Sequence, residues 1–342
     1  MSELFQFNDP SLESQWRALI LFGKNSATYK FAFGQALLNL IEKETTTVSL
    51  NQIAPLYVES ILEHLKTNDK QGNSSSSVFL NACRDFNRDI INYDQLINLT
   101  IKHGFNNVVD AFQNVNGGSV PNRFYEKDYS GASKNIVITD HLLRLKESIQ
   151  FKNLENEVQA RWNLVETAWN LDLNPNLLEV KIDHDLNTLF LENDFMRRKD
   201  ITSSRASLNG YQKGKCFYSF QDISIVSGSD NLCAVDHFFP HMHKVSLNEN
   251  GANVNGIWNL VLADKLVNLD KSAKVPDIKY LERLYKRNEF YIASRHPLGE
   301  TIINQTGKSA PARRAFLQKQ YDLALNLSIH RWKPIIELEP LF

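Results

Sequence analysis

The chain has 342 residues and a formal net charge of −1, with 42% hydrophobic and 23% charged residues. This length allows two or three domains, and the modest glycine and proline content excludes a collagen-like or low-complexity chain. The near-zero net charge argues against a protein that binds nucleic acid over its whole surface, although it allows a local basic patch. Three cysteines are too few for a disulfide scaffold, and no apolar run has the roughly 18 residues of a membrane helix. We therefore expect a cytoplasmic protein with no membrane contact.

The first 170 residues have mainly helical patterns. We expect helices within residues 16–40, 53–66 and 78–112, with a polar loop between the second and the third. From Thr139, apolar residues repeat every three or four positions, which predicts one long helix or two helices broken near Gln150. Its aromatic stripe is more typical of a core than of a binding surface. We predict a helical domain over residues 1–174 that serves in recognition, dimerisation or docking onto a partner.

The rest of the chain, residues 175–342, has a different pattern. Its hydrophobic periods predict a short hairpin at 177–193 and a helix at 203–213. The segment 216–276 then contains the predicted strands 216–219, 223–226, 234–239 and 258–262, with a loop rich in Asn and Gly over 248–256 before the last. A short helix begins near Asp264. The predicted fold class is α+β, mainly helical.

The dipeptide Asp-His occurs three times in the chain, and the copies differ in their surroundings. The copy at 140–141 opens a predicted helix, where an aspartate is expected in any case. The copy at 183–184 lies in a polar stretch with no partner motif. Only the third copy, Asp236-His237, lies in an apolar strand and is followed by a second strand and two spaced asparagines. This third copy is the candidate centre of chemistry.

The residues around this copy resemble the HNH, or ββα-metal, endonuclease motif, most closely as it occurs in RNA-guided CRISPR nucleases and HNH restriction enzymes. The resemblance covers about sixty residues and includes a proline after the first strand, a nine-residue step between two asparagines, and a lysine three residues beyond the second. The runs that carry it are Val235-Asp236-His237-Phe238-Phe239-Pro240, Asn259-Leu260-Val261-Leu262 and Asn268-Leu269-Asp270-Lys271-Ser272. It implies a C-terminal HNH nuclease module with its core at 216–276, flanked by helices.

Phosphodiester hydrolysis needs an activated water, a cation beside the phosphate, and groups that hold both in line. His237 is the candidate general base, because an imidazole can take a proton from water near neutral pH. The carboxylate of Asp236 and the amide oxygen of Asn268 could hold one Mg²⁺, for which Mn²⁺ could substitute. The resemblance implies that Asn259 is not a ligand, and that it braces the loop and orients His237. The plain alternative is a structural hairpin with a satisfied histidine and asparagines in turns.

Basic residues near the motif are candidates for contacts with DNA phosphates. Lys271 lies one helical turn from Asn268, and we add Lys244 and Arg295 as further phosphate contacts. The chain from 277 onward forms a basic helical extension, with predicted helices at 277–286 and 309–327. Its cations form either a solvated face or a surface that follows the phosphate backbone.

Many HNH domains carry two Cys-x-x-Cys pairs that bind a structural zinc, and this chain departs from that pattern. The first pair survives only as Cys216, with Ser219 in the second place, and the second pair would fall at Asp264 and Val267. We therefore expect no structural zinc, with Cys216 and likewise the cysteine at 233 as buried apolar residues. The histidines at 241 and 243 could bind a transition metal, but they fit better as loop residues near DNA.

The leading hypothesis is a metal-dependent DNA endonuclease that leaves 5′-phosphate and 3′-hydroxyl ends. By analogy with bacterial nucleases of this type, it would serve in restriction or anti-phage defence. One alternative is a nucleic-acid-binding subunit whose HNH fold only clamps a duplex. Another is an effector that is silent alone and is activated by a partner protein. Cleavage of both strands would need two sites, as in a homodimer, or two binding events.

Overall fold

The computed structural model describes residues 9–22, 26–42, 45–72, 76–115, 118–131, 133–170, 180–192, 198–328 and 331–342. Its contacts divide the described chain into two compact units, which are called the N unit (Pro10–Leu173) and the C unit (Asn174–Phe342 together with Asp9) below. The fold is α+β and mainly helical, as predicted. The predicted boundary between residues 174 and 175 falls within 171–179, outside the described residues. In the described part of the chain, no helix has both the length and the apolarity to cross a membrane.

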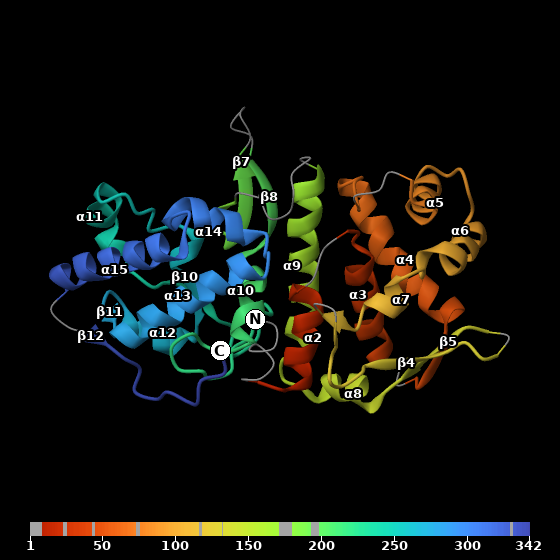
Figure 1. The fold of residues 1–342 in the computed structure, drawn as a ribbon, viewed down its shortest axis with the longest axis horizontal. Helices are drawn as coiled ribbons and strands as arrows, with labels where there is room; N and C mark the ends of the chain where they lie inside the picture. Colours follow the sequence, from red (N-terminus) through yellow and green to blue (C-terminus); the bar gives the residue numbers. More distant parts are fainter. Residues whose placement is uncertain are drawn as a thin grey trace. The chain divides into compact units, whose positions relative to one another are not determined.

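The N unit is built around α-helices (Figure 1). They are α2 (Leu12–Leu21), α3 (Tyr29–Ile41), α4 (Leu50–Thr67), α5 (Val78–Asn87), α6 (Tyr93–Leu99), α7 (Val108–Ala111), α8 (Asp140–Leu143) and α9 (Phe151–Asn170), with a π-turn at Thr100–Gly104 and a 3₁₀ turn at Arg144–Glu147. The chain leaves the helical path at Ser148 before α9 begins. The second form of the prediction, two helices broken near Gln150, is therefore confirmed.

Short strands in the N unit were not predicted. The strands β1 (Thr47–Ser49), β4 (Tyr125–Asp128) and β5 (Asn135–Ile138) form an antiparallel sheet in the order β1-β5-β4. A two-residue ribbon pairs β2 (Asn114–Val115) with β3 (Gly118–Ser119). Strands of two to four residues are too short to show a two-residue hydrophobic period, so periodicity does not predict them.

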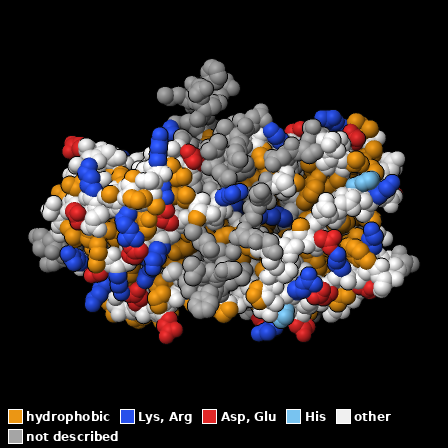
Figure 2. Space-filling model, viewed as in Figure 1, with side chains coloured by type: hydrophobic (Ala, Val, Ile, Leu, Met, Phe, Trp, Pro, Cys, Tyr) orange, Lys and Arg blue, Asp and Glu red, His pale blue; other side chains and the backbone are white. Residues whose placement is uncertain are grey.

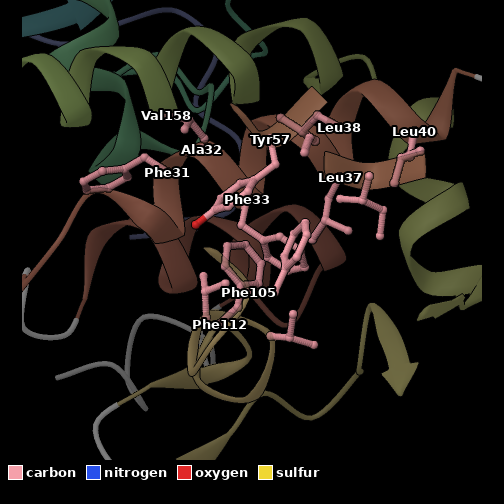
Figure 3. Packing of buried hydrophobic residues seen from close by; sticks show 14 of the residues in the cluster. Phe31, Ala32, Phe33, Leu37, Leu38, Leu40, Tyr57, Phe105, Phe112 and Val158 are labelled. Atoms are coloured by element: carbon pink, nitrogen blue, oxygen red, sulfur yellow. The ribbon is translucent and has the colours of Figure 1, made fainter. Parts of the chain in front are cut away.

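Aromatic rings form the centre of the N-unit core (Figure 3). The ring of Phe33 meets those of Tyr57, Phe105 and Phe112 edge-on, with centroid distances of 6.2, 6.4 and 5.4 Å. Edge-to-face contacts of this kind add to the hydrophobic free energy of burial. These rings come from α3, α4, the segment after the π-turn and the end of α7, so the core links elements from the whole unit.

The aromatic stripe of α9 belongs to this core, as the sequence predicts. Trp162 and Trp169 are buried. The imidazole of His64 on α4 lies parallel to the Trp162 ring at 3.7 Å, and its Nδ1 is 2.7 Å from a carboxylate oxygen of the buried Glu166. The stripe therefore packs inside the N unit and does not offer a binding surface.

The C unit begins with an antiparallel sheet of β6 (Lys181–Asp183), β7 (Thr188–Glu192) and β8 (Arg198–Ser203), followed by α10 (Ser204–Gln212). The hairpin and the helix were both predicted, although residues 177–179 and 193 of the predicted hairpin lie outside the described residues. The third strand, β8, was not predicted. The turn between β6 and β7 carries His184.

The centre of the C unit is an antiparallel hairpin followed by a short helix. The strand β9 (Ala234–His237) pairs with β10 (Leu260–Ala263), and His237 lies opposite Leu260. The helix α12 (Lys265–Lys271) follows at once, because the carboxylate of Asp264 accepts the first free N–H groups of its backbone. This strand, strand, helix order is the one that the sequence predicts.

The predicted strands at 216–219 and 223–226 are wrong. Residues 215–222 instead form a tight turn, closed by an isolated bridge between Lys215 and Asp222. Phe220, between the two predicted strands, has a φ of 59°, a left-handed conformation typical of turns. The apolar residues here are buried in a turn, and a run of apolar residues does not by itself distinguish the two cases.

The remaining elements of the C unit cover this hairpin. They are a 3₁₀ turn at His241–His243, α11 (Lys244–Glu249), a 3₁₀ turn at Ile257–Asn259, β11 (Val275–Pro276), α13 (Ile278–Ala293), α14 (Leu298–Thr306), α15 (Ala310–Leu327) and β12 (Arg331–Trp332). The helices α13, α14 and α15 pack against one another (Figure 1). The C-terminal tail runs back to the 215–222 turn, where the Leu338 N–H donates to the Ser219 carbonyl and the Phe342 ring lies 4.8 Å from the Phe220 ring.

Candidate functional site

His237 occupies the last position of β9, and its ring is fixed by Asn255 in the loop before β10. The Nε2 atom of His237 lies 3.2 Å from Oδ1 of Asn255. An amide oxygen only accepts hydrogen bonds, so Nε2 carries the hydrogen and Nδ1 is the unprotonated nitrogen of the neutral ring. Burial lowers the pKa of His237 to about 3, and the neighbouring His184 and His241 act in the same direction. The ring is therefore neutral at pH 7, with Nδ1 as its unprotonated nitrogen.

Two further histidines surround His237. The ring centroid of His184, in the β6–β7 turn, lies 4.5 Å from that of His237, and the ring of His241 lies 5.5 Å away. Sequence reasoning set His184 aside because no motif surrounds it, and a contact between residues this far apart in the chain has no local signal. The neighbour Asn255 was also missed, since asparagines are common in loops.

Asn259 ties together the two segments that flank His237. Its side chain is fully buried. Its Oδ1 accepts the Phe239 N–H at 2.8 Å, while its Nδ2 donates to the carbonyl oxygens of Phe239 and Val254 at 3.1 and 2.8 Å. These bonds join the end of β9 to the loop before β10. They are the contacts of a side chain that braces the loop and so holds the His237 backbone in place.

Asp236 belongs to a buried network with Lys271 and Tyr218. The Tyr218 hydroxyl donates to Oδ2 of Asp236 at 2.6 Å. The Lys271 ammonium lies 3.1 and 3.0 Å from the two carboxylate oxygens, and it also donates to the His237 carbonyl at 2.7 Å. Lys271 has no exposed surface, and Asp236 is 7% exposed. Burial raises the pKa of the Asp236 carboxyl, while the Lys271 ammonium and the Tyr218 hydrogen bond oppose that shift.

This network corrects two expectations about the site. Lys271 points into the protein, because its ammonium compensates the buried Asp236 carboxylate, so it is not placed to contact a DNA phosphate. Mg²⁺ takes oxygen ligands together with several waters, but both Asp236 oxygens already accept from protein donors. As placed, Asp236 and Asn268 therefore do not fit the expected Mg²⁺. Among the residues that the structure describes, no cluster of three or more His, Cys, Asp or Glu could hold a metal.

The other predicted residues lie around this network without joining it. Asn268 is half-buried on α12, three residues before Lys271. Lys244 opens α11, three residues beyond His241, and Arg295 is exposed just after α13. The contacts described above for the site include none of these three side chains. The expected phosphate contacts of Lys244 and Arg295 stay predictions, whereas Asn268 lacks the free Asp236 carboxylate with which it was expected to hold Mg²⁺.

The basic helices of the C-terminal extension use many of their cations within the protein. The carboxylate of Glu289 accepts two bonds from Arg313, at 2.6 and 2.7 Å, and Glu282 accepts two from Arg314, at 2.9 and 3.1 Å. Figure 2 shows Lys and Arg side chains interspersed with Asp and Glu on the face in view. These pairings favour the solvated face over a continuous track for phosphates.

The positions of the expected zinc ligands have other roles in this fold. Cys216 and Cys233 are fully buried, and burial raises the pKa of the Cys233 thiol to about 12. The Ser219 hydroxyl donates to the Gln221 side chain, and Asp264 caps α12. The two thiols are therefore core residues, as expected from the sequence.

Comparisons with family models, with curated proteins and with solved structures find no match to this chain. Only the site itself therefore indicates a function. Its chemical content is a neutral, half-buried imidazole with an unprotonated Nδ1, on a hairpin braced by a buried asparagine.

Proposed function

We propose that this chain is an endonuclease of the HNH type that hydrolyses phosphodiester bonds in DNA, with His237 as the general base. The observation that supports this most directly is the state of His237. It ends the first strand of a strand, strand, helix unit, its Nε2–H is committed to Asn255, and its Nδ1 is left to accept a proton. The bracing contacts of Asn259 support the same proposal.

The proposed reaction needs one proton transfer at His237. A water oxygen attacks phosphorus while Nδ1 of His237 takes one of the water's protons. The bond between phosphorus and the 3′ oxygen breaks, its electron pair goes to that oxygen, and solvent supplies the proton that forms the 3′-hydroxyl. The phosphate stays on the 5′ end of the other fragment. The Asn255 amide holds the imidazole ring so that Nδ1, and not Nε2, is available throughout.

A second candidate is a nuclease that is silent alone and is activated by a partner. One observation favours it: the Lys271 ammonium neutralises Asp236, the carboxylate beside the proposed base. A partner or bound DNA that withdraws α12 would free this carboxylate. Isolated protein would then be inactive although His237 is correctly placed.

A plasmid-nicking assay in Mg²⁺ or Mn²⁺ tests both candidates, with wild type, His237→Ala and the control His141→Ala in the N unit. We expect nicking by wild type and by the control but not by His237→Ala. DNA ligase should reseal the nicks, since ligation requires 5′-phosphate and 3′-hydroxyl ends. Equal nicking by all three would refute His237 as the base. Binding without cutting by all three would favour the clamp or the partner-activated effector.

A further inference from the structure

Hydrogen bonds within the β6–β7 turn of the C unit fix the backbone at His184. One carboxylate oxygen of Asp183 accepts the N–H groups of Asp185 and Leu186, at 3.0 and 2.9 Å. These bonds close an Asx turn, which sets the backbone path of the four-residue connection between β6 and β7. The position of His184 is therefore fixed by its own turn as well as by contacts with the rest of the C unit.

His184 and His237 share one anchor, Asn255. The two rings lie 4.5 Å apart with an angle of 31° between their planes. The Asn255 side chain accepts from His237, and a hydrogen bond to the Asn255 backbone raises the pKa of His184, against the larger opposing effect of burial. A bond that favours the protonated ring is one in which the ring donates. Each imidazole thus has one nitrogen directed to Asn255, and its other nitrogen lies outside that contact.

The other ring nitrogen of His184 is Nε2, which has no hydrogen-bond partner among the described residues. This atom is buried from solvent and makes no hydrogen bond within the described residues. Since Nε2 has no partner, the ring nitrogen that faces the Asn255 backbone is Nδ1, and in that neutral form Nε2 is the acceptor. A buried acceptor without a partner costs about 1–3 kcal/mol, so such an atom is normally satisfied by a water or a ligand.

We propose that His184 is a second active-site residue whose Nε2 accepts a hydrogen bond from the attacking water. This inference rests on the proposed nuclease function. The water donates one hydrogen to Nδ1 of His237, which removes it, and the other to Nε2 of His184, which keeps it in place. One water with hydrogen bonds of about 2.9 Å can bridge nitrogens of two tilted rings whose centroids lie 4.5 Å apart. With both hydrogens directed to nitrogens, the water presents an oxygen lone pair to phosphorus.

Two substitutions separate the acceptor from the ring. His184→Phe keeps an aromatic ring against His237 but has no acceptor, whereas His184→Gln places an amide oxygen near the position of Nε2. In single-turnover cleavage of a labelled duplex, we expect His184→Phe to lower the maximal rate by about tenfold to a hundredfold. The DNA concentration for half-maximal rate should change less than twofold. His184→Gln should recover at least part of the rate, and His141→Phe should match wild type.

Each result decides the matter in one direction. A wild-type rate in His184→Phe would overturn the proposal, and so would equal losses in the Phe and Gln variants, since the ring or the fold would then be what matters. Circular dichroism checks the fold, and His184→Leu replaces the Phe variant if the latter is unfolded. Wild type that does not cleave, or His237→Ala that cleaves normally, removes the proposed function and the role of His184 with it. Loss confined to His237→Ala leaves the function standing and refutes only the role of His184.

Discussion

The buried pair of Asp236 and Lys271 gives the sharpest prediction about stability. Lys271→Met removes the ammonium and keeps most of the apolar stem, so the Asp236 carboxylate loses its only described ion-pair partner. Breaking one side of a buried ion pair costs about 3–5 kcal/mol, because the remaining charge stays uncompensated. We expect a loss of this size in the free energy of unfolding of the C unit at pH 7. The Tyr218 hydrogen bond places the expected value toward the lower end of the range.

The pH dependence and a double variant identify the cause of that loss. Without Lys271, the pKa of Asp236 in the folded state rises further above its unfolded value, so the folded state holds a proton that the unfolded state releases. Stability then falls as pH rises through this window, and the variant should be closer to wild type at pH 5 than at pH 8. Asp236→Asn with Lys271→Met removes both charges and should recover much of the loss.

Urea unfolding of the full chain, followed by tryptophan fluorescence and circular dichroism, measures these differences. Lys274→Met is the matched control, since this exposed lysine lies three residues beyond Lys271 and, among the described residues, its ion pair is with Asp270 at 3.5 Å. It should change the free energy of unfolding by less than about 1 kcal/mol. A loss below about 1 kcal/mol in Lys271→Met, or no recovery in the double variant, would refute the buried pair.

Three further predictions concern the same site. Asn259→Ala leaves the Phe239 N–H without its acceptor, so it should cost about 1–3 kcal/mol and reduce the cleavage rate more than DNA binding, as urea unfolding and filter binding would show. With a pKa of about 3 folded and about 6.5 unfolded, His237 destabilises the C unit as pH falls below 6.5, by about 1 kcal/mol at pH 5.5; a pH series that is identical in His237→Gln would contradict this. Because the Lys271 ammonium occupies the Asp236 carboxylate, Mn²⁺ should bind Lys271→Met more tightly than wild type in electron paramagnetic resonance titrations; equal affinity would show that removal of Lys271 does not make Asp236 a cation ligand.

Much of the local order around the site could be predicted from the sequence. The spacing of apolar and polar residues predicted β9, β10 and α12, and Asp264 predicted where the helix begins. The three- and four-residue repeat of apolar residues in α9 predicted a core helix. These features depend on neighbours in sequence, which is the information that periodicity and capping contain.

The wrong predictions for the site concern side chains whose direction is set by tertiary packing. Asn268 and Lys271 lie three residues apart, which is about 300° of rotation around a helix, or 60° from a shared direction. This offset is enough for Lys271 to enter the protein and meet Asp236 while Asn268 stays half-exposed. No pattern in the sequence states which of the two faces β9. The same holds for His184, whose ring reaches His237 only through the fold of the C unit.

The most direct test of the central claim is the single-turnover rate of His237→Ala on a labelled DNA duplex, relative to His141→Ala. Both variants remove an imidazole that follows an aspartate, and only one of them lies at the proposed site. The account predicts that the His237 variant is slower by about a hundredfold or more, with unchanged affinity for the duplex. Equal rates in the two variants would contradict it.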